Sequence, residues 1–577
     1  MGVTLPPKQF LFGNELREKM FKGINLMREA VTATLGPNGR NVVIDRYMVN
    51  DITKDGVTVL ADVVLEDSFE EMGCKQVREA STKTNDEAGD GTTTAIEISW
   101  AACGAGIKKL HDGTNVIRLQ TGMQKAIDAV DENLTKMAIK CDGDANRYEQ
   151  VATIAAQDAE VGKKISGVFM ESGENGVIEI ERQDEPGIDT EHTDGMQIDN
   201  GWFSPYFIND FTNYSFGMDD CWVLVTDKQI TAFEELKWME RMGMDGKKKV
   251  IIFCDDCSGD ALATLVKSSR AGSFKCCVIK APAYGPRKVE ILKDIAVMTG
   301  ATFISEETGF ALHQIKPEHI GKVRQVTVRQ KKTVLIADRD LICLLNGESV
   351  TVDSRIKERV TQIETEIGLS EPESYEREKL KERLASLTDG VSVVKLGANT
   401  EAERILLKRK VEDAIHAVEC AKQEGIVAGG GTALLKCVKV LDDIVCENPD
   451  EQIGVEIIRE AIQSPSRRIL EVAAVEPGYA PWYYRTCAFM RKRWKKRCQD
   501  RIIERVKMSV VNEVGYDMSD TSNYDCVDLV EKGVIDPVKV VRTAFKNGAS
   551  CAKTFLSEEV GITPIKDKDP ATNPALR

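Results

Sequence analysis

Residues 85–95 read Asn-Asp-Glu-Ala-Gly-Asp-Gly-Thr-Thr-Thr-Ala and lead from a polar helix end through two glycines into an apolar segment. Gly89 and Gly91 allow the backbone to approach a ligand closely, and the threonines open a helix whose first N–H groups lack helical partners. Because such a helix start attracts anions, the stretch predicts a phosphate-binding loop. Asp90 would repel phosphate unless a cation lay between them, so we interpret it as a Mg²⁺ ligand. A plain turn with a threonine N-cap remains the alternative.

Three further stretches resolve this ambiguity. Residues 34–43 read Thr-Leu-Gly-Pro-Asn-Gly-Arg-Asn-Val-Val, residues 52–57 read Ile-Thr-Lys-Asp-Gly-Val, and residues 424–433 read Glu-Gly-Ile-Val-Ala-Gly-Gly-Gly-Thr-Ala. With residues 85–95, and in this order, they closely resemble the group I chaperonins, the family of bacterial GroEL and the mitochondrial chaperonin. The resemblance covers nearly the whole chain, from Phe12 to Pro537. A Walker loop is excluded, because Gly-x-x-x-x-Gly-Lys-Ser/Thr occurs nowhere in the sequence.

Length and composition set wider bounds. A chain of 577 residues exceeds one core, so two or three domains are expected. Its formal charge of -15 argues against a general nucleic-acid binder, and no apolar run reaches the ~18 residues of a membrane span.

The 16 cysteines lack a repeating framework, which favours reduced thiols. Cys254 and Cys257 have a metal-like spacing, but they follow an apolar run, and we favour buried thiols over zinc.

The amino terminus points to an intracellular protein. Met1 to Phe10 contain neither a secretory apolar core nor an arginine-rich amphipathic leader. We therefore expect a cytoplasmic location, with the mitochondrial matrix as the alternative if a leader has been removed.

The expected fold is multidomain, α+β and α/β. The resemblance implies an α-helical equatorial ATP-binding domain of residues 1–136 and 424–577, a hinge domain of 137–193 and 391–423, and an α/β apical domain of 194–390. Apolar periodicity predicts helices over 14–34, 70–85, 92–110, 115–140, 375–387 and 391–423. Short apolar runs predict strands at 41–45, 57–60, 176–180, 223–225, 250–253, 277–279 and 302–304. Residues 338–360 exceed the usual family length.

The resemblance implies Mg²⁺- and K⁺-dependent ATP hydrolysis. Asp55 and Asp413 match the catalytic carboxylates that position water. An isolated Asp413 would be interpreted as a solvated helix residue. Because its Val-Glu-Asp-Ala context matches the family, we favour the catalytic role instead. We expect its helix to swing toward the nucleotide. Asp90 would hold Mg²⁺, with Thr34, Lys54 and Thr93 near K⁺. The residues matched to nucleotide contacts are Thr34, Leu35, Gly36, Pro37, Lys54, Asp90, Gly91, Thr92, Thr93, Thr94, Gly430, Asp517 and Asp536.

Client capture needs exposed apolar surface, since unfolded chains share no common sequence. The matched residues are Trp202, Phe203, Ser204, Tyr206, Phe207, Leu262 and Val266, with rim helices near 233–242 and 260–268. Core packing of Trp202 and Tyr206 is the alternative. Lys237, Glu240 and Lys267 stand at positions that are usually apolar, so the client range and the use of a lid cochaperonin are open.

Two substitutions alter expected contacts. The resemblance implies a seven-membered homo-oligomeric ring, single or double, that encloses unfolded or misfolded polypeptides. Asn200 replaces an arginine that pairs with a neighbouring subunit at the position of Glu401, which removes one salt bridge between subunits. Asp517 stands where an asparagine usually meets the base, which is expected to weaken nucleotide affinity.

The largest departure is an insertion at about 479–513. Residues 485–507 contain ten Lys/Arg and two Asp/Glu, interleaved with apolar side chains. We favour an amphipathic helix packed on the equatorial domain, with contact to nucleic acid or an anionic membrane as the alternative. A rival function is a binding or scaffold protein acting through this insertion. Deleting residues 485–507 would distinguish a chaperone from this scaffold protein, since chaperone activity is expected to survive the deletion. A metabolic ATPase is a second rival, and it need not form a large ring.

Overall fold

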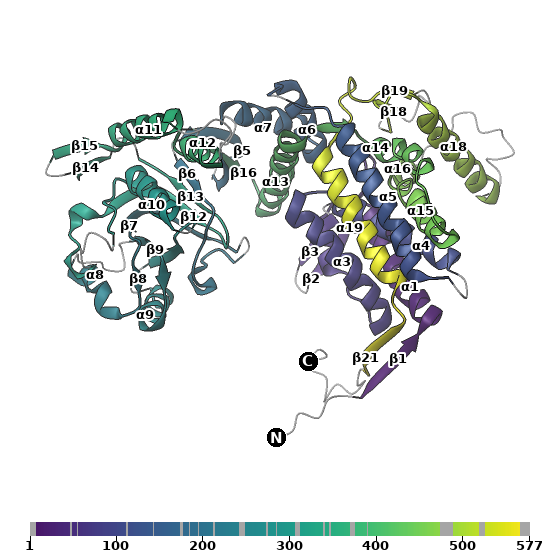
Figure 1. The fold of residues 1–577 in the computed structure, drawn as a ribbon, viewed down its shortest axis with the longest axis horizontal. Coiled ribbons are helices and arrows are strands. Elements are labelled where there is room, and N and C mark those ends of the chain that lie inside the picture. The colour runs from purple at the N-terminus through teal and green to yellow at the C-terminus, as the bar shows by residue number, and fades with distance from the viewer. Residues whose placement is uncertain are drawn as a thin grey trace. The chain divides into compact units, whose positions relative to one another are not determined.

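The computed structural model describes residues 7–46, 49–54, 56–110, 114–141, 143–172, 177–183, 185–193, 195–211, 214–241, 249–272, 275–283, 285–305, 312–338, 341–345, 348–369, 375–388, 390–473, 488–518 and 526–565. The chain divides into two compact units (Figure 1). Unit 1 comprises residues 1–166 and 405–577, and unit 2 comprises residues 167–404. The segments expected to form a hinge domain are thus shared between the units, and the three-domain division stays a prediction. In the described residues, no helix has the length and hydropathy of a membrane span.

Unit 1 is a bundle of long helices around one apolar core. The main helices are α1 (Gly13–Thr32), α3 (Ser68–Ala88), α4 (Thr92–Lys109), α5 (Val116–Lys136), α15 (Pro449–Ala461) and α19 (Val538–Leu556). In α1 the apolar residues recur every three or four positions, and Met20, Ile24 and Met27 are buried. Gly23 and Gly73 let α1 and α3 cross closely, because a Cβ on either would lie within 2.2 Å of a backbone oxygen of the other helix.

Short strands join distant parts of unit 1. Near the two chain ends, β1 (Lys8–Phe12) pairs antiparallel with β21 (Val560–Pro564). β2 (Val42–Arg46) pairs with β3 (Val49–Thr53), β17 (Ile426–Ala428) with β20 (Ile535–Pro537), and β18 (Val514–Tyr516) with β19 (Cys526–Asp528). Further helices of the unit include α2 (Gly56–Asp62), α6 (Ala145–Ala156), α14 (Thr432–Lys436) and α16 (Ser464–Val472).

One strand prediction in unit 1 is wrong. Residues 57–60 belong to the helix α2, and the partner of β2 is β3. The run Val-Thr-Val-Leu has high strand propensity, but α2 buries Val59 and Leu60 in the core. Tertiary burial of this one face therefore overrides the local preference of the β-branched residues.

The main sheet of unit 2 has six strands in the order β11-β9-β7-β12-β13-β6. Its first three strands, β7 (Phe216–Val225), β9 (Lys249–Cys254) and β11 (Lys275–Lys280), run parallel. The other three, β12 (Gly321–Val328), β13 (Thr333–Ile336) and β6 (Gly195–Ile198), pair antiparallel. The nearby helices α9 (Gly259–Arg270) and α10 (Pro286–Thr299) pack against this α/β core. The strand predicted at 302–304 is reduced to one bridge, between Ile304 and Thr226.

A second, three-stranded sheet in unit 2 has the order β4-β16-β5. β16 (Val391–Gly397) lies between β4 (Val177–Arg182), which is parallel to it, and β5 (Gly187–Thr193), which is antiparallel. The prediction of continuous helix over 391–423 is therefore wrong for its first third. Helix α13 (Glu401–Glu424) begins only after this strand, and its Ile405 and Leu406 are exposed rather than on a buried face.

The long segment near residue 340 forms a hairpin and a helix. β14 (Ile342–Leu345) pairs with β15 (Glu348–Thr351), and α11 (Val352–Leu369) follows. Two arginines, Arg359 of α11 and Arg383 of α12 (Tyr375–Thr388), bind the buried carboxylate of Asp294 at 2.7 Å. Shorter elements of unit 2 include the strands β8 (Gln229–Ile230) and β10 (Asp256–Cys257) and the helix α8 (Lys237–Arg241). Helix α7 (Ala159–Glu171) crosses the boundary between the units.

The basic insertion forms a helix, α18 (Ala488–Met508), as the apolar spacing predicts. It lies against α14, α16 and β18 of unit 1 (Figure 1). Ile502, Ile503 and Val506 are buried there, whereas Lys496 and Arg497 are exposed. The favoured interpretation, an amphipathic helix packed on the surrounding unit, is confirmed for the part whose side chains the structure describes.

Candidate functional site

A cavity of about 1250 Å³ in unit 1 collects residues that are far apart in the sequence. Its walls come from the end of α1, the turn between α3 and α4, the glycine loop before α14, α13, β18 and β20. Of the predicted nucleotide residues it contains Thr34, Leu35, Gly36, Pro37, Lys54, Asp90, Gly91, Thr92, Thr93, Thr94, Asp413, Gly430, Asp517 and Asp536. Asp55 lies outside the described residues, and its neighbours Lys54 and Gly56 line the cavity.

The turn between α3 and α4 forms the predicted anion-binding part of this cavity. Gly89 ends α3 in a left-handed conformation, with φ of 66°, and Gly91 precedes α4 with φ of 89°. Within the described chain, no side chain caps the start of α4, so its first N–H groups remain available to a ligand. Asp90 is exposed between these glycines. This arrangement can bind phosphate oxygens and present a carboxylate to a cation beside them.

The glycine loop 429–431 lines the same cavity through Gly430 and Gly431. β17 leads into it, and the antiparallel register with β20 sets Val427 opposite Asp536. Gly430 and Gly431 have φ of 63° and 73°, and the Gly430 N–H donates a hydrogen bond to the Asp536 carboxylate. The loop therefore fixes the position of Asp536, whose side chain faces the cavity.

Two acidic groups in this cavity influence each other. Burial, and to a smaller extent the negative charge of Asp90, raises the pKa of Asp536 from 3.8 to about 6. The hydrogen bond from the Gly430 N–H opposes this shift. Part of Asp536 remains reachable by solvent through the cavity. Carboxylates that disfavour each other's charge are suited to a bound cation, since a cation relieves the repulsion. The donor set thus fits Mg²⁺ held beside Asp90.

We expect Asp536→Asn to stabilise the nucleotide-free, Mg²⁺-free protein above pH 6. The folded pKa is raised, so the stabilising contribution of Asp536 is fully present below pH 3.8 and is lost as pH rises through about 6. Allowing for partial solvation, the gain for the variant is about 1–2 kcal/mol at pH 7.5 and vanishes near pH 4. Thermal unfolding at both pH values in EDTA measures it. An equal difference at the two pH values would contradict the assignment.

The segment after α1 supplies the next part of the wall. Thr34 turns back to donate its hydroxyl to the carbonyl oxygen of Val31 at 2.8 Å. Lys54 donates from Nζ to Oε1 of Gln157 at 3.2 Å, and both residues line the cavity. The next residue, Asp158, pairs with Lys410 of α13 at 3.1 Å, and this hydrogen bond lowers the pKa of Asp158. Polar contacts therefore connect the strand end after β3 to α6–α7 and to α13.

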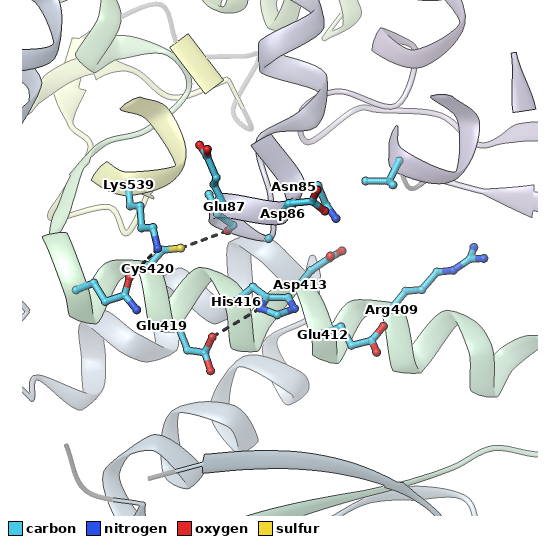
Figure 2. Close-up of a pocket in the computed structure, with 14 residues that line it drawn as sticks. Asn85, Asp86, Glu87, Arg409, Glu412, Asp413, His416, Glu419, Cys420 and Lys539 are labelled. Carbon is cyan, nitrogen blue, oxygen red and sulfur yellow. Dashed lines mark hydrogen bonds and ion pairs between the residues drawn. The ribbon is translucent and has the colours of Figure 1, made fainter. Parts of the chain in front are cut away.

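Helix α13 brings Asp413 to the cavity. A Cβ on Gly89 would lie 2.5 Å from the His416 ring, so glycine is needed for α13 to pack on this turn. The Cys420 thiol donates to the carbonyl oxygen of Ala88 at 3.2 Å. Figure 2 shows the Asp413 side chain directed toward the segment that carries Asn85 and Asp86. Close packing of α13 on the glycine turn thus places a carboxylate beside the predicted phosphate site.

Asp413 also lines a neighbouring cavity of about 530 Å³, drawn in Figure 2. Glu412 and Glu419 of α13 and Lys539 of α19 lie in this second cavity but not in the first. Lys539 donates to the side chain of Gln423 at 2.8 Å, and His416 lies 3.7 Å from Glu419. The carboxylate of Asp413 therefore differs from its helical neighbour Glu412 in reaching the larger cavity.

The predicted client-binding residues lie in unit 2 and differ in exposure. Phe207 is buried in the apolar core, and Ser204 is buried and accepts a hydrogen bond from the Tyr206 N–H. Trp202, Phe203, Leu262 and Val266 are half-buried and pack on the same core. Tyr206 is 58% exposed, and the Arg270 guanidinium lies 4.7 Å from its ring centre. Within this group, Tyr206 and the outer edges of the half-buried side chains are open to a partner.

The departures from the family pattern also have places in unit 2. Lys237 and Lys267 are exposed, whereas the side chain of Glu240 lies outside the described residues. Asn200 donates from Nδ2 to the carbonyl oxygen of Ala281 at 2.9 Å. Glu401 pairs with Arg404 on its own helix. Both positions expected to bridge subunits therefore have partners within this chain.

Cys254 and Cys257 behave as buried thiols. Both are almost inaccessible, and their side chains hydrogen-bond to each other, which raises the pKa of the Cys254 thiol. Among the described residues, no group of three His, Cys, Asp or Glu side chains has a metal-binding arrangement. The described cysteines are all free thiols.

Sequence reasoning missed the apolar side of the cavity. Leu434, Ile469, Tyr516 and Met518 line it together with Pro465. These residues follow ordinary core patterns, so only their position next to Gly430, Asp517 and Asp536 marks them. Adjacency to Asp517, already a candidate, was the available signal for Tyr516 and Met518.

Comparisons with known proteins agree with this architecture. A model of the TCP-1/cpn60 chaperonin family matches residues 27–249 and 244–560. The chain is similar to crystal structures of the chaperonin gp146 from bacteriophage EL 2 (Pseudomonas aeruginosa), obtained in the presence of ATP-BeFx. At 19% identity the likeness covers 96% of this chain and 99% of gp146, with a TM-score of 0.69 for one crystal form and 0.61 for the other.

Proposed function

Because the chain belongs to the TCP-1/cpn60 chaperonin family, we propose that it is an ATP-driven molecular chaperone that captures and releases non-native polypeptides. The observation that carries this proposal is the larger cavity of unit 1. It collects two glycine loops, an uncapped helix start and the carboxylates of Asp90, Asp413 and Asp536. The crystallisation of the similar phage chaperonin with ATP-BeFx supports nucleotide as the ligand.

In the proposed chemistry, each group of residues that lines the cavity has its own role. The N–H groups at the start of α4 and the hydroxyls of Thr92–Thr94 bind phosphate oxygens. Asp90 would hold Mg²⁺, which neutralises charge on the phosphates when bound. Asp413, with Asp55, orients the attacking water and accepts its proton. Thr34, Lys54 and Thr93 are the proposed neighbours of K⁺, and Asp536 and Gly430 bind the nucleoside.

The proposed client surface lies in unit 2. Tyr206, Leu262 and Val266 offer apolar surface beside Trp202 and Phe203, and non-native chains bind such surface without a shared sequence. Phe207 supports this surface from within the core. Exposed Lys237 and Lys267 make this part of unit 2 more charged, so we propose a narrower client range.

The proposed assembly is a homo-heptameric ring of the group I type, single or double, in the cytoplasm. The boundaries 1–136 with 424–577, 137–193 with 391–423, and 194–390 serve as the proposed equatorial, hinge and apical domains. Helix α13 extends across the limit between the two compact units. It is therefore the proposed path by which nucleotide binding in the cavity that Asp413 lines affects client binding.

Two measurements on the purified full chain test the proposal together. We expect ATP hydrolysis that requires Mg²⁺, rises with K⁺ and stops in EDTA, by a particle of about seven subunits or a multiple of seven in mass photometry. A metabolic ATPase needs no such ring. Hydrolysis by a monomer or dimer would contradict the chaperone assignment, and a ring that fails to bind ATP would favour the rival role as a scaffold acting through residues 485–507.

A further inference from the structure

Helix α18 packs its carboxyl-terminal half into a small apolar cluster. Ile503 and Val506 are 1% and 2% exposed, and they belong to one cluster with Leu435, Leu470, Ala473, Ile502, Tyr516 and Met518. Because a closely packed cluster of this kind has little free volume, its side chains hold one another in place. Removing a side chain from one side therefore allows those on the opposite side to move.

The same cluster forms the apolar wall of the nucleotide cavity. Tyr516 and Met518 belong to the cluster and also line the cavity, and Ile469 packs on the cluster and lines the cavity too. Asp517 lies between the first two in sequence. The apolar cluster that includes Ile503 and Val506 of the insertion therefore shares side chains with the lining of the space proposed for the nucleoside.

Polar contacts hold α18 in this position. Lys436, a buried residue of α14, donates from Nζ to the carbonyl oxygens of Ser509 at 3.2 Å and Val511 at 2.8 Å. A cation beside the carboxyl end of a helix stabilises its terminal carbonyl groups. Farther along α18, Asp500 accepts from Arg467 of α16 at 2.6 Å. Since α14 starts directly after the glycine loop, Lys436 connects this loop to the end of α18.

We propose that α18 is a positioning element for the nucleotide, in which Ile503, Val506 and Lys436 hold the wall formed by Tyr516 and Met518 in its binding position. This inference rests on the proposed function as an ATP-driven chaperone. It replaces the expectation that residues 485–507 are dispensable, because their carboxyl-terminal half supports the cavity from behind. None of the three residues lines the cavity, so they act through the wall and not on the reacting atoms.

Ile503→Ala tests the apolar contact. Its expected effect is an increase of about tenfold in both the Kd of Mg-ATP, measured by isothermal titration calorimetry, and the KM, with kcat within about twofold of the parent. Met508→Ala is the matched control, since it shortens an apolar side chain on the same helix that is 74% exposed. The control should bind ATP with the parent's affinity.

Lys436→Met tests the polar contact and covers the case in which Ile503→Ala fails to fold. We expect it to raise the Kd of Mg-ATP about fivefold or more, and Lys436→Gln, which keeps a donor, to restore much of the affinity. Thermal unfolding identifies folded variants. The inference is overturned if the folded variants bind ATP within twofold of the parent. If the parent itself binds no ATP, the proposed function fails, and this inference fails with it.

Discussion

Asp413→Ala is expected to lower kcat for ATP at least about tenfold while the protein still binds ATP, because the role proposed for this carboxylate is to act on the attacking water and not on the bound nucleotide. Asp413 lines both cavities, whereas its neighbours on α13, Glu412 and His416, line only the smaller one. Single-turnover hydrolysis measures the chemical step, and calorimetry measures ATP binding by the same preparation.

Glu412→Ala is the control for this experiment. Glu412 precedes Asp413 on the same helix, carries the same charge and pairs with Lys408 at 3.5 Å away from the larger cavity. Its removal changes the local charge equally but should leave kcat within about twofold. If the two variants lose activity to the same extent, a general electrostatic effect explains the loss, and Asp413 is not the catalytic carboxylate.

Glu97→Ala is expected to lower the free energy of unfolding of unit 1 by about 3–5 kcal/mol, because the buried Arg28 charge then keeps only the more distant carboxylate of Glu471, 3.9 Å away. The Arg28 guanidinium donates from Nε and Nη2 to the two oxygens of Glu97, at 2.7 and 2.9 Å, and Ser464 donates to the same carboxylate. Glu97 is 1% exposed. The ring of Trp100 lies 4.1 Å below the guanidinium, so the cation is enclosed on both sides.

Two comparisons separate this effect from a general loss of charge. The double variant Arg28→Met with Glu97→Leu replaces both charges with apolar groups and should recover most of the lost stability. Glu132→Ala breaks an exposed pair with Lys136 on α5 and should change stability by less than about 0.5 kcal/mol. Denaturant unfolding of nucleotide-free protein measures all three. A Glu97→Ala protein as stable as the parent would show that solvent reaches the pair.

Local chemistry explains why much of the site could be predicted. The conformations of Gly89, Gly91 and Gly430 depend on their missing side chains, and a helix start binds anions through its own backbone. A few consecutive residues determine such features, so they can be predicted from the sequence. Asp413 required more, since a lone aspartate on a helix carries no signal, and its family context supplied the prediction.

The errors arose where distant partners decide the structure. Residues 57–60 have strand propensity but are helical because Val59 and Leu60 reach the core, and residues 391–397 are a strand because β4 and β5 lie on either side. Short apolar runs fit either structure until their neighbours are known. For the same reason the proposed role of Ile503 could not be read from the sequence, because α18 and β18 bring Ile503 and Tyr516 into one apolar cluster only in the folded chain.

In the proposed function, ATP drives the release of a captured polypeptide, and the release of a fluorescently labelled, chemically unfolded client tests this most directly. The client is first bound to the nucleotide-free assembly, and Mg-ATP is then added to the parent and to Asp413→Ala. We predict that the parent releases the client over repeated turnovers, whereas Asp413→Ala completes no more than a single slow cycle. A client that never binds, or that leaves at the same rate with and without ATP, would contradict the account.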